Sequence, residues 1–218
     1  MNMHKDTQQR FDINLSEIVP EYESKNPLVR WLFNKRLSIA LNLLSDIDAR
    51  TIADIGCGDG SLLRLINSSD LNVDELWGVD LNPGILALKR DMPNAQFAID
   101  NLFNMRFDSN RFDAVTCLDT LEHMQNISKA VQELKRILKN NAYLITSEPV
   151  ESALYRSLRF VLKGTYSQES GPSAGAHYHN AREVDQALTK VGFIRERLVR
   201  VPLHTPFDLF WIARYLIH

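Results

Sequence analysis

The chain has 218 residues, which is longer than one domain of typical size and shorter than two, so we expect one domain with terminal additions. Apolar residues make up 44% and charged residues 24% of the chain, which excludes a disordered, low-complexity or collagen-like protein. The 25 Lys and Arg residues against 27 Asp and Glu residues give a formal charge of −2, which argues against binding of nucleic acid over a broad basic surface.

Two further features of the chain bear on its compartment. The N-terminal segment MNMHKDTQQRFDINLSE has no apolar core, and the longest apolar run, residues 209–213, is far shorter than the ~20 residues that span a bilayer. Cys57 and Cys117 lack the spacing of a metal site. We therefore expect a cytoplasmic protein without a transmembrane segment and with both thiols reduced.

The first predicted element is a helix. Asn26 and Pro27 have the pattern of an N-cap and a first-turn proline, and apolar residues follow at helical spacing as far as Leu44. From Thr51 the pattern changes to short apolar runs typical of strands, which read TIADI, ELWGVD, NAQFAID, FDAVTCL and AYLITSE. Segments with helical apolar spacing lie between these runs: Ser61–Asn67, Pro83–Arg90 and residues 127–139.

The alternation of strands and helices indicates an α/β fold, with a largely parallel sheet covered by helices on both faces. Asn180 is expected to cap a last helix over residues 181–191, which Gly192 ends before the strand-like run FIRERLV. We divide the single domain, 1–218, into an N-terminal helical cap (1–50), a cofactor-binding core (51–150), a substrate-side insertion (151–180) and a C-terminal helix with strands (181–218).

Two segments of the chain allow more than one interpretation. Residues 151–163 have an apolar face beside a basic one; we favour a helix packed over the site and keep peripheral contact with a membrane surface as the alternative. Residues 164–175 have the composition of a flexible loop. The C-terminal run LHTPFDLFWIARYLIH fits an edge strand, a packed helix or a dimer contact, so the oligomeric state stays open.

The sharpest motif is DIGCGDG at residues 54–60, directly after one predicted strand and directly before a predicted helix. Glycines there let the backbone turn tightly and approach a ligand, and the helix offers free N–H groups. The spacing is G-x-G-x-G rather than the G-x-G-x-x-G of dinucleotide-binding proteins. Asp54 would lie unfavourably near a pyrophosphate but would attract an ammonium group, so the loop favours a cationic ligand over NAD.

Acidic residues also end the second and third predicted strands. Asp80, in GVDLN, is placed to accept both hydroxyls of a ribose. Asp100 precedes Asn101, Leu102 and Phe103, which together offer polar groups to the edge of an adenine and apolar cover to its face.

The motifs DIGCGDG, VDLN, IDNLF and FDAVTCLDTLEH resemble, in order and register, those of class I S-adenosylmethionine-dependent methyltransferases, including the type 11 and ubiquinone-biosynthesis groups, over residues 51–199. The resemblance implies a Rossmann-like, seven-stranded, mostly parallel sheet and S-adenosylmethionine as cofactor. It places the methionine part on the glycine loop, the ribose on the second-strand acid and the adenine on the third-strand acid. The cofactor-binding residues would then be Asp54, Gly56, Cys57, Gly58, Gly60, Asp80, Leu81, Asp100, Asn101, Leu102 and Leu118.

The chemistry is expected just after Leu118, because ligands of open α/β sheets bind beyond the carboxyl ends of the strands, where the strand order reverses. Since the methyl group of this cofactor is already activated, an enzyme needs to align the acceptor and, for a hydroxyl or thiol, remove its proton. His123, His177 and His179 are the candidate bases, although His123 would equally brace the helix that follows. We therefore expect O-methylation of a small-molecule acceptor, with lipid-like and quinone-like acceptors included.

The pattern Asp119-x-x-Glu122-His123 resembles the E-x-x-E-H pattern that ubiquinone-type O-methyltransferases and small-RNA 2′-O-methyltransferases use for a divalent metal, except for Asp at the first position. We expect no metal and keep this set as the minor alternative. A metal-assisted RNA 2′-O-methyltransferase lacks support from the net charge. The remaining alternatives are an NAD-linked oxidoreductase and a cofactor-binding protein without catalysis.

Overall fold

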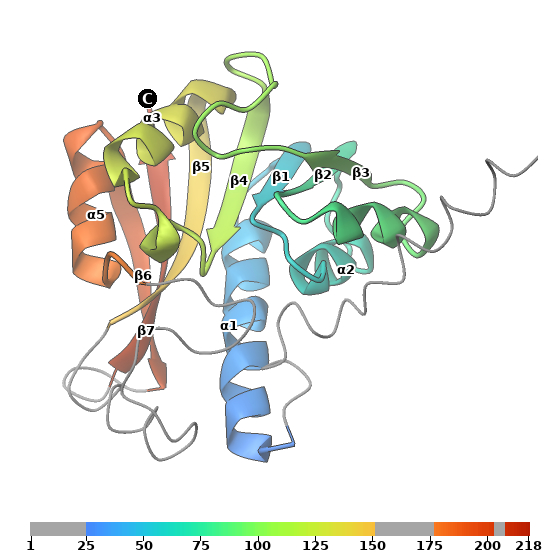
Figure 1. Ribbon diagram of the computed structural model, residues 1–218, viewed down its shortest axis with the longest axis horizontal. Coiled ribbons are helices and arrows are strands. Elements are labelled where there is room, and N and C mark those ends of the chain that lie inside the picture. The colour runs from blue at the N-terminus through green and yellow to red at the C-terminus, as the bar shows by residue number, and fades with distance from the viewer. Residues whose placement is uncertain (1–24, 151–176, 203–207) are drawn as a thin grey trace, which may run out of the picture.

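The computed structural model describes residues 25–150, 177–202 and 208–218. They form a seven-stranded sheet with the strand order β3-β2-β1-β4-β5-β7-β6 (Figure 1). The strands are β1 Thr51–Ile55, β2 Glu75–Asp80, β3 Gln96–Ile99, β4 Phe112–Leu118, β5 Leu138–Pro149, β6 Ile194–Pro202 and β7 Asp208–Ile217. Strand β7 pairs antiparallel with β5 and β6, and the pairs among β1 to β5 are parallel, which confirms the mostly parallel Rossmann-like sheet.

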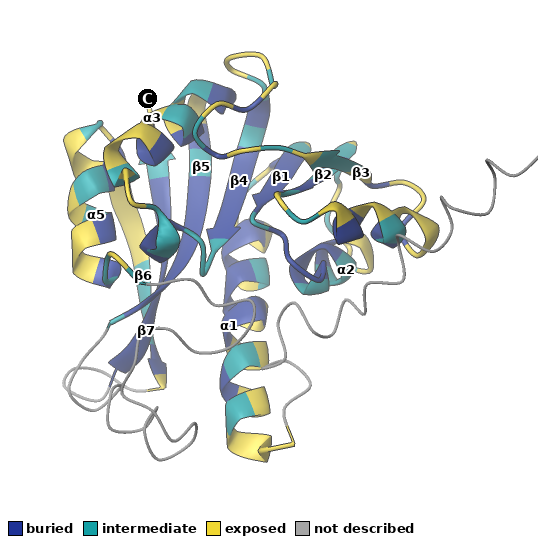
Figure 2. Ribbon diagram, in the orientation of Figure 1, coloured by how far each residue is buried: buried dark blue, intermediate teal, exposed yellow. Residues whose placement is uncertain are grey.

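Helices cover both faces of this sheet. The α-helices are α1 Pro27–Ser45, α2 Ser61–Asn67, α3 Ile127–Ile137 and α5 Ala181–Lys190, and the 3-10 helices are η2 Pro83–Arg90 and η3 Leu121–His123. One buried cluster joins α1, α2 and η2 to the face that carries Ile52, and a second joins α3 and α5 to the face that carries Ala53. Neighbouring strand residues point to opposite faces, so the central strands are buried from both sides (Figure 2).

Helix α1 begins where the sequence predicted. The side chain of Asn26 accepts a hydrogen bond from the N–H of Leu28, and Pro27 occupies the first turn. The helix packs against α2, β5, β6 and β7, and its N-terminal half runs past the end of β4 (Figure 1). Its residues therefore reach the edge of the sheet where ligands of this fold class bind.

Three expectations about elements need correction. Within the C-terminal run, Asp208–Ile217 form an internal strand, β7, rather than an edge strand or a packed helix, and β6 lies at the edge of the sheet. The segment Pro83–Arg90 is a 3-10 helix, in which Ile85 and Leu88 are buried three residues apart. Helix α3 ends at Ile137 rather than at residue 139, because Leu138 already pairs with Phe112 in the sheet.

Two further expectations fall at the limits of the described residues. The helix expected at residues 151–163 and the loop expected at 164–175 lie outside them, so the division of the domain stays a prediction. Among the described helices, none combines the length and the apolar character that crossing a membrane requires. Cys57 and Cys117 are both buried free thiols, as expected.

Candidate active site

The glycine loop joins β1 to α2 and approaches the turn after β4. Gly56, Gly58 and Gly60 have φ angles of 75°, 53° and 75°, the left-handed region that favours glycine. A Cβ atom on Gly56 would lie 2.1 Å from Oγ1 of Thr120, so a side chain at this position is excluded by contact as well as by φ. The loop therefore presents bare backbone at the place where strands β1 and β4 end side by side.

Asp80, at the carboxyl end of β2, points toward this loop. Its Oδ2 accepts a hydrogen bond from the N–H of Gly58 at 3.0 Å, and its Oδ1 accepts one from the N–H of Asn82 at 2.9 Å. Each oxygen keeps a lone pair, so the carboxylate is oriented and can still accept hydroxyl hydrogens. Leu81, next in the chain, is 63% exposed and offers apolar surface beside it.

Asp54, at the end of β1, is buried. Oγ1 of Thr116 donates a hydrogen bond to its Oδ1 at 2.6 Å. Burial raises the pKa of Asp54 to about 7, and the charges of Asp80 and Asp59 add to the effect. A nearby cationic group would favour the charged form of this carboxyl, which fits the ammonium group expected from the sequence. Burial likewise raises the pKa of the neighbouring Cys57 thiol.

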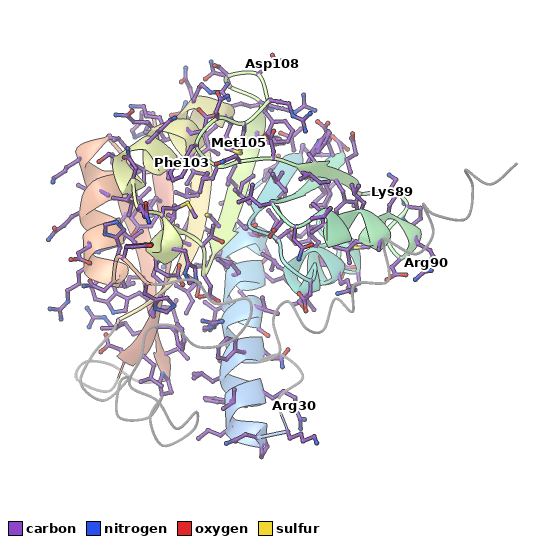
Figure 3. All side chains as sticks on the ribbon, in the orientation of Figure 1. Arg30, Lys89, Arg90, Phe103, Met105 and Asp108 are labelled. Atoms are coloured by element: carbon purple, nitrogen blue, oxygen red, sulfur yellow. The ribbon has the colours of Figure 1, made fainter. Side chains whose placement is uncertain are left out.

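Asp100 lies in the turn after β3 and is held by its own loop. Its carboxylate accepts hydrogen bonds from the N–H groups of Asn101 and Arg106 at 2.9 and 2.8 Å. Asn101 is exposed, whereas Leu102 is buried in the core. The loop then crosses toward α3, carrying Phe103 and Met105 (Figure 3). Leu118, on β4, is partly buried against the other core cluster.

The turn after β4 begins with an ion pair that connects it to α1. Arg36 donates from Nη1 to Oδ1 of Asp119 at 2.9 Å and from Nη2 to Oδ2 at 2.5 Å. The Arg36 side chain is 2% exposed and that of Asp119 is 27% exposed. The N–H of Asp119 also donates to the carbonyl oxygen of Ser147 on β5 at 2.8 Å. Asp119 is therefore bound to the protein rather than free beside the site.

Glu122 and Glu148 are a pair of acids buried behind this turn, each 2% exposed. Burial raises the pKa of both carboxyl groups; the charge of Asp119 adds to the effect on Glu122, and the charge of Glu122 adds to that on Glu148. Two adjacent buried carboxyls cannot easily both ionise, so the arrangement favours the protonated form of at least one of them.

His123 and His177 come together although they are far apart in the sequence. Their ring centroids are 4.8 Å apart at an interplanar angle of 74°, and Nε2 of His123 lies 3.9 Å from Oε1 of Glu122. The N–H groups of Tyr178 and His179 donate to the carbonyl oxygen of Glu122 at 2.7 and 3.2 Å, which ties the segment before α5 to the turn after β4.

The candidate bases are thus divided. The ring of His179 lies near α5, with its Nδ1 4.0 Å from Oε2 of Glu183, whereas the rings of His123 and His177 lie next to each other. Ligand atoms of Glu122, His123 and His177 lie within 4.8 Å of one another, a spacing that fits a divalent metal. The metal alternative considered from the sequence included Asp119, which the structure pairs with Arg36.

Sequence reasoning missed Arg36 and Glu148. Arg36 stands four residues from Leu32 and from Ala40, so it lies on the buried face of α1. A charged residue on the apolar face of a predicted helix could have marked it as a candidate functional residue. Glu148 follows Thr146 and Ser147 at the end of β5, so the polar end of this strand carried a weaker signal. The sequence alone does not show which groups these two side chains contact.

Comparison with known proteins adds the following. A family model described as a methyltransferase domain matches residues 53–146. The chain is 29% identical over 160 residues to a ubiquinone biosynthesis O-methyltransferase of Alkalilimnicola ehrlichii, covering 67% of this chain and 60% of that protein. More generally, it spans about half to three-fifths of the length of the curated relatives it matches.

Two solved structures show the same fold. The N-methyltransferase NodS of Bradyrhizobium japonicum, in complex with S-adenosylhomocysteine, superposes with a TM-score of 0.68 at 17% identity, covering 97% of each chain. The small RNA methyltransferase HEN1 superposes with a TM-score of 0.67 at 22% identity, covering 86% of this chain and 25% of that one.

Proposed function

We propose that this chain, whose residues 53–146 match a methyltransferase domain, is a class I S-adenosylmethionine-dependent methyltransferase that transfers a methyl group to a hydroxyl of a small-molecule acceptor. The family match leaves the NAD-linked alternative without support. The observation that carries the proposal is the meeting of His123 and His177 at the carboxyl end of β4, where the acceptor and the methyl group must meet.

The residues at the ends of β1 to β3 fit the cofactor. When bound, S-adenosylmethionine supplies a methyl group that is already activated for in-line displacement. Asp80 would hold the ribose with its oriented carboxylate, and the glycine loop, with its left-handed backbone at Gly56 and Gly58, would hold the methionine part. Buried Asp54 would favour the ammonium end, and Asp100 with Asn101 would bind the edge of the adenine.

The residues after β4 fit deprotonation of the acceptor. A neutral imidazole of His123 or His177 can accept the hydroxyl proton as the oxygen attacks, which is the usual role of histidine in general base catalysis. In its ionised form, Glu122, 3.9 Å from His123, would stabilise the positive charge that the ring then acquires. A mechanism by orientation alone would need none of these groups.

The acceptor class we favour is a lipid-like or quinone-like phenol. Support comes from the relative named for ubiquinone biosynthesis, which is described as an O-methyltransferase. We further propose that α1 and residues 177–180 contribute to the wall of the acceptor site.

A methyl-transfer assay tests this proposal. The protein is incubated with methyl-labelled S-adenosylmethionine and a panel of a prenylated catechol, a matched catechol methylated on both oxygens, an aromatic amine and an RNA duplex. We expect label in the free catechol and none in the blocked one. Label in the amine or the RNA instead would contradict O-methylation of a small molecule.

A metal-assisted reaction is a second candidate, favoured by the proximity of Glu122, His123 and His177. A divalent cation held there would polarise the acceptor hydroxyl, and the imidazoles would then act as ligands rather than as bases. Chelation separates the two versions, because full turnover in the presence of chelator contradicts the metal version. Loss of turnover that Mg²⁺ or Mn²⁺ restores would support it.

A further inference from the structure

We propose that Arg36, in the N-terminal helix, is a positioning residue for the cofactor pocket and acts through Asp119 and Thr120 on the glycine loop. This inference rests on the proposed function to the extent that the glycine loop holds the methionine part of the cofactor. None of the cofactor residues expected from the motifs lies on α1, so the inference adds a remote part of the chain to the pocket.

The first step is the fixed geometry of the guanidinium. Arg36 is almost fully buried, and its two terminal nitrogens donate to the two oxygens of Asp119. Its Cζ atom lies 4.0 Å from the ring centroids of both Phe33 and Phe210. Bidentate pairing combined with aromatic contact gives the guanidinium little freedom, so the carboxylate it holds is fixed too.

The second step is the backbone of Asp119. Its φ angle is 49°, in the left-handed region that non-glycine residues adopt only where their surroundings hold them. The hydrogen bond from its N–H to the carbonyl oxygen of Ser147 on β5 holds its backbone, and the ion pair with Arg36 holds its side chain. Loss of the ion pair therefore allows this residue to relax toward more common backbone angles.

The third step is the contact between Thr120 and Gly56. Thr120 follows Asp119 directly, and its Oγ1 donates to the carbonyl oxygen of Leu118 at 2.9 Å. Its side chain occupies the space where a Cβ atom of Gly56 would be. Packed atoms do not compress, so a shift of Asp119 moves Thr120 against the glycine loop and changes the shape of the methionine site.

Arg214 provides a matched control. It is also buried, at 7% exposure, and also joins α1 to the sheet, because Nη1 donates to the carbonyl oxygen of Leu43 at 3.1 Å. It lies over the ring of Tyr143 and forms an ion pair with Glu196 at 3.3 Å. These partners lie on α1, β5 and β6 rather than on the glycine loop or on the turn after β4.

The test is calorimetric titration of S-adenosylhomocysteine into the wild type and into Arg36→Met, Asp119→Asn, the double variant and Arg214→Met, each checked for folding by thermal melting. We expect Arg36→Met and Asp119→Asn each to weaken binding by about tenfold, the scale of coupling between connected sites. The double variant should bind no more weakly than the weaker single variant, because the two residues act as one unit. Arg214→Met should melt earlier and bind the ligand within about twofold of the wild type, the error of additivity for distant sites.

Each other outcome has a defined meaning. Wild-type affinity in a folded Arg36→Met protein would overturn the proposal, and so would an equal loss of affinity in Arg214→Met, which would show that the seating of α1 alone matters. If Arg36→Met does not fold, Asp119→Asn decides, because asparagine keeps the shape and tolerates the left-handed backbone. Absence of binding by the wild type would contradict the proposed function itself, which is a distinguishable result.

Discussion

The two halves of the site are built in different ways. On the cofactor side, made of the turns after β1, β2 and β3, the polar groups are held by neighbouring backbone: Asp80 by Gly58 and Asn82, and Asp100 by its own loop. On the acceptor side, made of the turn after β4 and the groups around it, α1, β5 and the segment before α5 all contribute. Apart from the hydrogen bond of Asp54 with Thr116, these contacts of the first half join residues up to 22 positions apart, whereas Arg36 and Asp119 of the second half are 83 positions apart.

The largest effect is expected on the acceptor side, from His123→Ala. If His123 is the base, removing its imidazole should lower turnover by roughly 10²–10⁴, the usual contribution of general base catalysis. Affinity for S-adenosylhomocysteine should stay near that of the wild type, because the proposed cofactor contacts lie on the other half.

The matched control for this prediction is His218→Ala. His218 is exposed at the end of the chain, where its ring is within 2.8 Å of the side chain of Asn141. Its loss should leave turnover unchanged. Normal turnover in both His123→Ala and His177→Ala would eliminate the base and leave orientation as the mechanism.

The next effect is expected on the cofactor side, from Asp80→Ala. Each charge-assisted hydrogen bond lost should weaken cofactor binding by about 1.5–3 kcal/mol, since the ribose hydroxyls would lose an oriented acceptor. Calorimetry measures it, with Asp74→Ala, an exposed carboxylate before β2, as the control. Unchanged affinity in Asp80→Ala would show that the ribose binds elsewhere.

A smaller effect is expected on the pH dependence of the free energy of unfolding, and it concerns Asp54 alone. Its folded-state pKa of about 7 lies above the ordinary value of 3.8, so the folded protein holds a proton that the unfolded chain releases. The free energy of unfolding should therefore fall as the pH rises from about 4 to about 7, because the unfolded chain loses this proton at lower pH than the folded protein does.

Denaturant unfolding at several pH values, without cofactor, measures this slope. The variant Asp54→Asn should lack this part of the decline, while the exposed Asp74→Asn should keep it. Parallel pH profiles for the wild type and Asp54→Asn would mean that Asp54 ionises normally.

The smallest effect is expected at the start of α5, next to the segment that carries His177. Asn180 forms a capping box with Glu183, and Asn180→Ala should destabilise the protein by about 1 kcal/mol. Asn126→Ala, at the N-cap of α3, should have a similar effect on the melting temperature. If the acceptor side depends on long-range assembly, only Asn180→Ala should also lower turnover. Equal turnover in both variants would weaken that view.

The same contrast explains what the sequence could predict. The glycine loop, Asp80 and Asp100 each follow a recognisable strand, so parallel strand order alone brings them to one edge of the sheet. The contact of His123 with His177 could not be derived, because it depends on the path of the chain after β5. Likewise Arg36 was readable as a charge on an apolar helix face, but its pairing with Asp119 requires the packing of α1 on the sheet.

The internal position of β7 has a related cause. Its run of buried residues is compatible with a strand or a packed helix, and only its pairing with both β5 and β6 decides between an edge and an interior place. Local motifs therefore predicted the residues of the proposed cofactor side, whereas the strand order at the far end of the sheet could be determined only from the tertiary structure.

Calorimetric titration of the wild-type protein with S-adenosylmethionine, S-adenosylhomocysteine and NAD, each with and without Mg²⁺, shows which cofactor the chain binds. The expected cofactor contacts are protein carboxylates and backbone groups. We therefore expect saturable binding of both adenosyl ligands, with affinities that do not depend on the metal, and no binding of NAD. Binding of NAD without detectable binding of either adenosyl ligand would contradict this expectation.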